Sequence, residues 1–197
     1  MNEYSASRLI ALAELLFMPM IFYILTQWEK MNSWQSKILW FMIFALVQNE
    51  FLSVRTSYRM YTAPLYLLDL LSLIMYVFCI DALANENSVL GYNPIFWIYI
   101  SVLWAGYAVW DFRMNSLENN DQMKIKYKEW GRLMVLFFII TLLCGLGLIL
   151  LSNVNNSQTS IFYALYILQL IPFGFILWAL TWWIRDLKTI LADSKQS

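Results

Sequence analysis

The sequence predicts an all-α, polytopic integral membrane protein: a bundle of about six transmembrane helices with the N- and C-termini in the cytoplasm. Three observations support this fold class: an apolar composition, six long apolar segments, and basic residues concentrated in alternate connecting segments. Of the 197 residues, 61% are hydrophobic and only 13% are charged, whereas about a quarter of a typical soluble domain is charged. The composition therefore indicates a chain that lies mostly within lipid.

Each apolar segment can cross a bilayer core, which requires about 20 mostly apolar residues. The six predicted spans are residues 9–28, 38–54, 65–83, 95–110, 133–151 and 161–184. Because backbone polar groups must be satisfied within lipid, we expect every span to be a helix. The first segment is not followed by a small-residue cleavage pattern, so we interpret it as a permanent span. The spans form one domain, residues 1–197, with a cytoplasmic loop at 111–132 and a tail at 185–197.

The basic residues orient these spans. Eleven of the thirteen lysines and arginines lie on one side of the membrane, and only Lys30 and Lys37 lie on the other. Cytoplasmic loops carry an excess of basic residues, so that side is predicted to be the cytoplasm. We expect a multi-pass protein in the cytoplasmic, or inner, membrane of a prokaryote.

Polar residues within or beside the spans are the candidate functional residues, because such groups are costly in lipid and usually face a protein interior. The candidates for a pore or polar network are Glu14 in the first span; Gln48, Asn49 and Glu50 in the second; Arg55 and Arg59 in the second loop; Asp69, Ser72 and Tyr76 in the third span; Asp111 and Arg113 at the end of the fourth; and Gln169 in the sixth.

Four acids, Glu14, Glu50, Asp69 and Asp111, are expected at a similar depth near the inner boundary, close to the arginines. One interpretation is a structural network, in which arginines pair with acids and tie helix ends together. Another is an inner vestibule whose carboxylates attract cations or bind a polar ligand. A third is simple snorkelling of charged groups into the headgroups.

The third span carries a polar stripe. Its members follow spacings of three and four residues and therefore share one helical face: Asp69, Ser72, Tyr76, Cys79 and Leu83. The stripe could line a pore, or it could form a seam between helices. We favour the seam, because Asp69 is the only charged residue on it.

Two prolines are predicted kinks, Pro19 in the first span and Pro172 in the sixth. In the fifth span, Gly145 and Gly147 would allow a close approach between helices.

The cytoplasmic segments offer contacts for lipid or for a partner. Lys124, Lys126 and Lys128 alternate with apolar residues, a pattern typical of an anchor to anionic headgroups. In the tail, Leu187, Ile190 and Leu191 mark one face that could pack on the membrane, on a sister subunit or on a soluble partner.

The sequence argues against several functions. It contains no histidine, the commonest metal ligand and general base, and no catalytic motif, so we predict a non-enzymatic protein without metal or cofactor. Its net charge of zero argues against binding nucleic acid. The leading hypothesis is a homo-oligomeric, channel-like pore or carrier of a small solute or ion, with an acidic inner vestibule. The alternative is a membrane-anchored accessory, sensor or effector protein, for example of a prokaryotic immunity or stress system, that docks a soluble partner through its loop and tail.

Overall fold

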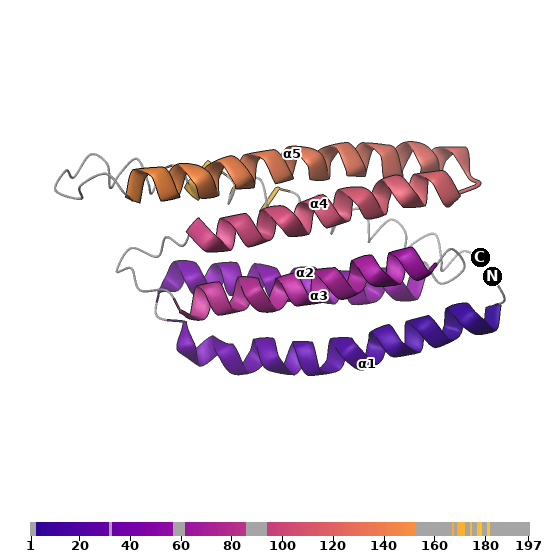
Figure 1. Ribbon diagram of the computed structural model, residues 1–197, viewed down its shortest axis with the longest axis horizontal. Helices are drawn as coiled ribbons and strands as arrows, with labels where there is room; N and C mark the ends of the chain where they lie inside the picture. Colours follow the sequence, from indigo (N-terminus) through magenta and orange to yellow (C-terminus); the bar gives the residue numbers. More distant parts are fainter. Residues whose placement is uncertain are drawn as a thin grey trace.

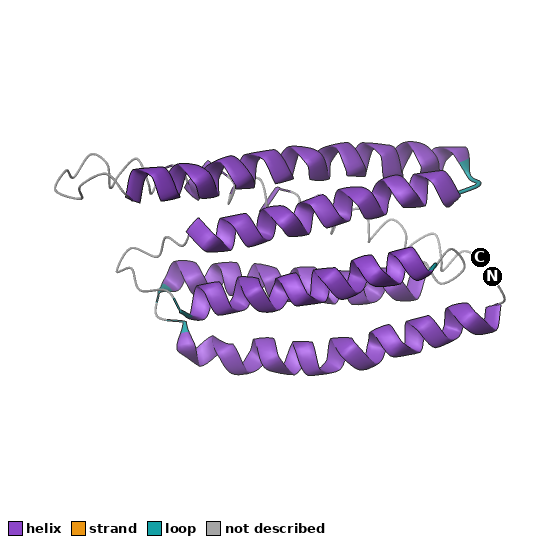
Figure 2. Ribbon diagram, viewed as in Figure 1, coloured by secondary structure: helices purple, strands orange, loops and turns teal. Residues whose placement is uncertain are grey.

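The computed structural model describes residues 3–31, 33–56, 62–85 and 94–152, together with positions 167, 169–171, 174, 177, 178 and 181 of the sixth predicted span. Its helices are α1 (Glu3–Gln27), the short 3-10 helix η1 (Trp28–Lys30), α2 (Trp34–Thr56), α3 (Ala63–Ala84), α4 (Pro94–Leu117) and α5 (Asp121–Ser152). Figure 2 shows that the described residues are helical apart from short turns, without any strand. The all-α prediction is confirmed for this part of the chain.

The helices lie side by side, and consecutive helices run in opposite directions (Figure 1). Within the described residues, α3 occupies the centre, because it packs on α1, α2 and α4. The fifth helix packs on the outer side of α4, and this pair has the most extensive contact in the bundle. Polar residues on α3 are therefore held among several neighbouring helices.

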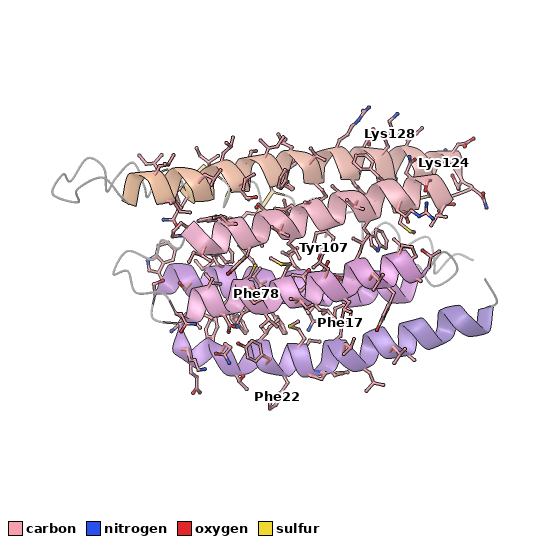
Figure 3. All side chains as sticks on the ribbon, viewed as in Figure 1. Phe17, Phe22, Phe78, Tyr107, Lys124 and Lys128 are labelled. Atoms are coloured by element: carbon pink, nitrogen blue, oxygen red, sulfur yellow. The ribbon has the colours of Figure 1, made fainter. Side chains whose placement is uncertain are left out.

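Three of the described helices are long and apolar enough to cross a membrane: α3, α4, and residues Asp121–Leu150 of α5. Their neighbours α1 and α2 also present large apolar side chains to the outside. Leu15 and Phe22 on α1 are each 70% exposed, and Phe41 on α2 is 62% exposed. Figure 3 shows Phe17 pointing into the bundle and Phe22 pointing away from it. Outer surfaces this apolar are rare on soluble proteins, and with the three long helices they indicate a membrane protein.

Each of the first five predicted spans coincides with a helix, but residues 111–132 differ from the expected loop. Helix α4 continues to Leu117 and α5 begins at Asp121, so three residues connect them. The Asn120 side-chain oxygen accepts hydrogen bonds from the backbone N–H groups of Gln122 (2.9 Å) and Met123 (3.4 Å). These bonds cap the start of α5. The region is therefore a helical hairpin. The sequence predicted a loop here because hydropathy shows where the apolar residues end, whereas both helices continue into polar residues.

Close contacts hold neighbouring helices together. A Cβ atom added at Gly145 on α5 would lie 2.9 Å from the Ile98 side chain and 3.1 Å from the Pro94 carbonyl oxygen of α4. Glycine is thus needed for the approach of these two helices. Between α1 and α2, the indole N–H of Trp40 donates to the carbonyl oxygen of Ile24 at 2.7 Å. Helix α1 runs without a break through Pro19 and is visibly bowed in Figure 1.

Candidate functional site

The polar stripe of α3 is buried along its whole length: Asp69, Ser72, Tyr76, Cys79 and Leu83 are all inaccessible or nearly so. The opposite face of the same helix is apolar and exposed: Leu67, Leu71, Ile74 and Phe78. The helix therefore presents its hydrogen-bonding side chains to other helices and its apolar side chains to the outside of the bundle. This arrangement is typical of a seam between helices within a membrane.

Glu50 of α2 meets this stripe and is only 4% exposed. Its Oε2 atom accepts a hydrogen bond from the Tyr76 hydroxyl of α3 (2.7 Å) and another from the Tyr107 hydroxyl of α4 (2.7 Å). The two phenol oxygens also contact each other directly. Figure 3 shows Tyr107 extending from α4 toward α3 and α2. Three helices thus each contribute one side chain to a single cluster of oxygens.

The second carboxylate oxygen of Glu50, Oε1, is buried and has no hydrogen-bond partner among the described residues. Two buried hydroxyls elsewhere in the bundle are satisfied by their own helices. Ser101 donates to the carbonyl oxygen of Ile98 (2.6 Å), and Thr141 donates to that of Phe137 (2.7 Å). A buried polar atom without a partner typically costs about 1–3 kcal/mol, more if it is charged. Among the described residues, Glu50 Oε1 is the only atom of a carboxyl group in this condition; the other buried polar atoms without a partner are Thr62 Oγ1, Trp104 Nε1 and Trp110 Nε1.

A second carboxyl group lies near Glu50. Asp69, two turns before Tyr76 on α3, is 4% exposed, and its charge acts on both Glu50 and Tyr107. Ser72 lies between Asp69 and Tyr76 and faces Glu50, while its hydroxyl donates to the Leu68 carbonyl oxygen at 3.0 Å. No basic group among the described residues acts on Glu50. The site therefore concentrates negative charge in a desolvated place, where like charges repel strongly.

The partners of Glu50 lie well inside helices α3 and α4. Tyr76 lies thirteen residues after Ala63, the first residue of α3, which corresponds to about 20 Å along the helix. Tyr107 lies ten residues, or about 15 Å, before the end of α4 at Leu117. The oxygen cluster thus lies near the middle of both helices rather than at their ends. We name Glu50, Asp69, Tyr76 and Tyr107 the acidic site.

Asp111 lies apart from the acidic site, one turn after Tyr107 on α4, and is also buried at 9% exposure. It acts electrostatically on Tyr127 of α5. Arg113 is exposed on another face of α4, so it does not share the buried environment of Asp111. Asp111 and Arg113 therefore lie on different faces of α4.

Two of the other polar candidates lie away from the site. Gln48 is exposed. Gln169 accepts a long hydrogen bond (3.5 Å) from the indole of Trp97, near the start of α4. Trp97 precedes Tyr107 by ten residues, about 15 Å along the helix. Gln169 therefore connects the sixth predicted span to the N-terminal end of α4, away from the acidic site.

The remaining candidates can be placed only in part. On α5, Lys124 pairs with Asp121 at 3.4 Å, and Lys126 and Lys128 are exposed. The remaining candidates lie outside the described residues or have side chains that are not described: Glu14, Asn49, Arg55, Arg59, Pro172, Leu187, Ile190 and Leu191. The expected pairing of acids with Arg55 or Arg59 therefore stays a prediction.

Two important tyrosines were absent from the sequence prediction. Tyr107 is the only hydroxyl-bearing residue between Ser101 and Ser116 in the α4 sequence, and it directly follows Gly106. Tyr23 of α1 donates a hydrogen bond to the Asp81 carboxylate of α3. A phenol in the middle of an apolar span was the available signal, since a buried tyrosine hydroxyl usually finds a partner.

Among the described residues, no three cysteine, aspartate or glutamate side chains gather closely enough to hold a metal ion. Both cysteines, Cys79 and Cys144, are buried and unpaired with each other. Comparisons with known protein families, with curated proteins and with solved structures gave no match for this chain. The chemistry of the acidic site therefore carries the functional argument.

Proposed function

We propose that this protein is a small, non-enzymatic, multi-pass membrane protein that moves a small cation across the membrane, as a carrier or a channel-like pore. The binding site is the acidic site. One observation carries the proposal: Glu50 Oε1 is buried without a hydrogen-bond partner among the described residues, while a second carboxyl group, that of Asp69, acts on Glu50. Ionisable residues retained within a membrane domain commonly lie on an ion or substrate path.

A purely structural role explains this arrangement less well. A structural carboxylate in a low-dielectric environment would pair with a base, because removing charge from water is offset only by good partners. The described partners of Glu50 are instead neutral hydroxyl groups: Tyr76 and Tyr107, which bind the same oxygen atom, and Ser72. This leaves negative charge available for a mobile cation.

The proposal includes the topology expected from the basic residues: six spans, both termini in the cytoplasm, and the inner membrane of a prokaryote. The alternating directions of the helices support it (Figure 1). They place the α4–α5 turn, with Lys124 beside it, at one end of the bundle, and η1, with Lys30, at the other. Assembly into a homo-oligomer belongs to the same proposal, and a native mass measurement in detergent would test it.

The test is a flux assay in proteoliposomes containing the full chain, with protons, Na⁺ and K⁺ offered in turn. We expect flux from the wild-type protein and its loss in Glu50→Gln and in Asp69→Asn. Glu129→Gln is the matched control, because Glu129 is exposed on α5 and should retain wild-type flux. Absence of flux from folded wild-type protein, or full flux in both variants of the acidic site, would contradict the proposal.

A second function, docking of a soluble partner, is favoured by the α4–α5 hairpin. The hairpin consists of two helices joined by a turn of three residues, and Ile125 on it is 60% exposed beside the exposed Lys126 and Lys128. If this surface binds a partner, replacing Lys124, Lys126 and Lys128 by glutamine should abolish the cellular phenotype of the gene and leave liposome flux intact. An unchanged phenotype would exclude docking through these lysines.

A further inference from the structure

The hydrogen atoms of the acidic site can be counted. Three oxygens contact one another in pairs: the Tyr76 hydroxyl, the Tyr107 hydroxyl and Glu50 Oε2. Each contact needs one hydrogen atom between the two oxygens, and a phenol supplies only one. Two phenols therefore serve two of the three contacts. If Glu50 is ionised, one contact has no hydrogen.

A third hydrogen on Glu50 Oε2 completes the arrangement. The carboxyl O–H then donates to one phenol, that phenol donates to the other, and the second phenol donates back to Oε2. Each of the three oxygens donates once and accepts once. Oε1, which has no partner among the described residues, becomes the carbonyl oxygen of a neutral acid. Burying a neutral oxygen without a hydrogen bond costs less free energy than burying a charged one.

From this count we infer that Glu50, Tyr76 and Tyr107 hold one exchangeable proton, and that this proton is the cation bound at the acidic site. The inference rests on the proposed function and names its ligand. Binding forms one O–H bond between a proton from the aqueous phase and the Glu50 carboxylate, and it removes one negative charge. Release reverses both changes and requires no other reactant.

The surroundings favour a proton over a metal cation. The titratable groups that act on Glu50 from the described parts of neighbouring helices are Asp69 and Tyr76 on α3 and Tyr107 on α4. A metal ion needs several oxygen lone pairs directed at one point, whereas Glu50 Oε2 and the two phenol oxygens are engaged in hydrogen bonds with one another. Asp69 adds a negative charge that a proton on Glu50 relieves.

The test is infrared spectroscopy of the full-length protein in liposomes, because a protonated carboxyl group has its own C=O band, which shifts in heavy water. We expect wild-type protein to show this band, to lose it when the pH is raised, and to recover it when the pH is lowered. In Glu50→Gln the band should be missing. In Tyr107→Phe it should persist at a shifted frequency, because one of the hydrogen bonds to the acid is gone.

Asp111→Asn is the control, since Asp111 is a buried acid outside the acidic site; it should keep the Glu50 band. The inference is wrong if the wild-type band is unchanged in Glu50→Gln. It is also wrong if Na⁺ or K⁺, rather than pH, removes the band. If Glu50→Gln does not fold, the frequency shift in Tyr107→Phe decides, and an unshifted band overturns the inference.

The infrared and flux measurements together distinguish failure of the proton site from failure of the proposed transport. A reversible Glu50 band without flux of any cation would establish the proton site and refute transport. Flux that depends on Glu50 in a protein without the band would support transport and refute the bound proton.

Discussion

Tyr107 of α4 donates a 2.7 Å hydrogen bond to Glu50 of α2, although 57 positions separate the two residues in the sequence. Helices α2 and α4 each pack on α3, and this bond joins them directly to one another. The same Glu50 oxygen binds Tyr76 of α3. One carboxylate therefore links three helices, so that a change in its charge would alter the packing of all three.

Tyr107→Phe should lower the free energy of unfolding by about 1 kcal/mol, since hydrogen bonds between helices in membranes contribute on average about 0.6 and at most about 1.7 kcal/mol. The ring remains and only the hydroxyl is lost. Reversible unfolding in mixed micelles measures the effect. Tyr99→Phe is the control, because the Tyr99 ring stacks on Phe78 and no hydrogen bond of its hydroxyl occurs within the described residues. Equal stability of the two variants would contradict the prediction.

The Tyr23–Asp81 hydrogen bond between α1 and α3 should appear as a coupling energy in a double-mutant cycle. We expect Tyr23→Phe and Asp81→Asn each to destabilise the protein, and the double variant to lose less than the sum of the two. The difference should lie between about 0.6 and 1.7 kcal/mol. Strictly additive losses would mean that the bond does not contribute to stability.

Replacement by alanine should change the stability of the protein differently at Gly145 and at Gly106, although both glycines lie within helices. A Cβ atom at Gly145 would meet the Ile98 side chain at 2.9 Å and α4 backbone atoms at 3.1 and 3.2 Å, and overpacking of this kind costs about 1–3 kcal/mol. At Gly106 the nearest atom is the Ser72 hydroxyl oxygen at 4.0 Å. Gly106→Ala should therefore be neutral or stabilising by up to about 1 kcal/mol.

Unfolding midpoints of the two alanine variants, measured in the same detergent, would check this difference. Gly145→Val should be worse than Gly145→Ala because it adds further methyl groups at the closest point of the α4–α5 contact. A Gly145→Ala variant as stable as Gly106→Ala would show that the two helices can move apart at little cost.

Cysteine labelling should show the two ends of the bundle on opposite sides of the membrane. A membrane-impermeant thiol reagent added to intact cells should label Lys30→Cys and not Lys128→Cys; inverted vesicles should give the opposite result. Cys79 and Cys144 are buried, so the unmodified protein serves as the unlabelled control. Labelling of both positions from the same side would refute the proposed topology.

The five long helices of the described residues and the polar face of α3 could be predicted from the sequence. Apolar length predicts a helix wherever a chain crosses lipid, and spacings of three and four residues place Asp69, Ser72 and Tyr76 on one side. Both are properties of a single segment and need no knowledge of its neighbours. The sequence predicted a loop at 111–132, whereas α4 extends past its apolar segment to Leu117 and α5 begins before its own apolar segment, at Asp121.

Which polar groups contact one another could not be predicted from the sequence. Glu50 and Tyr107 are 57 positions apart, Tyr23 and Asp81 are 58 apart, and Trp97 and Gln169 are 72 apart. Whether such pairs meet depends on how each helix is rotated and how deep it lies against the next. Those two quantities are set by packing over whole helix surfaces, including the close approach at Gly145. The sequence therefore predicted four acids at a similar depth, whereas helix packing brings Glu50, Asp69, Tyr76 and Tyr107 together in one site.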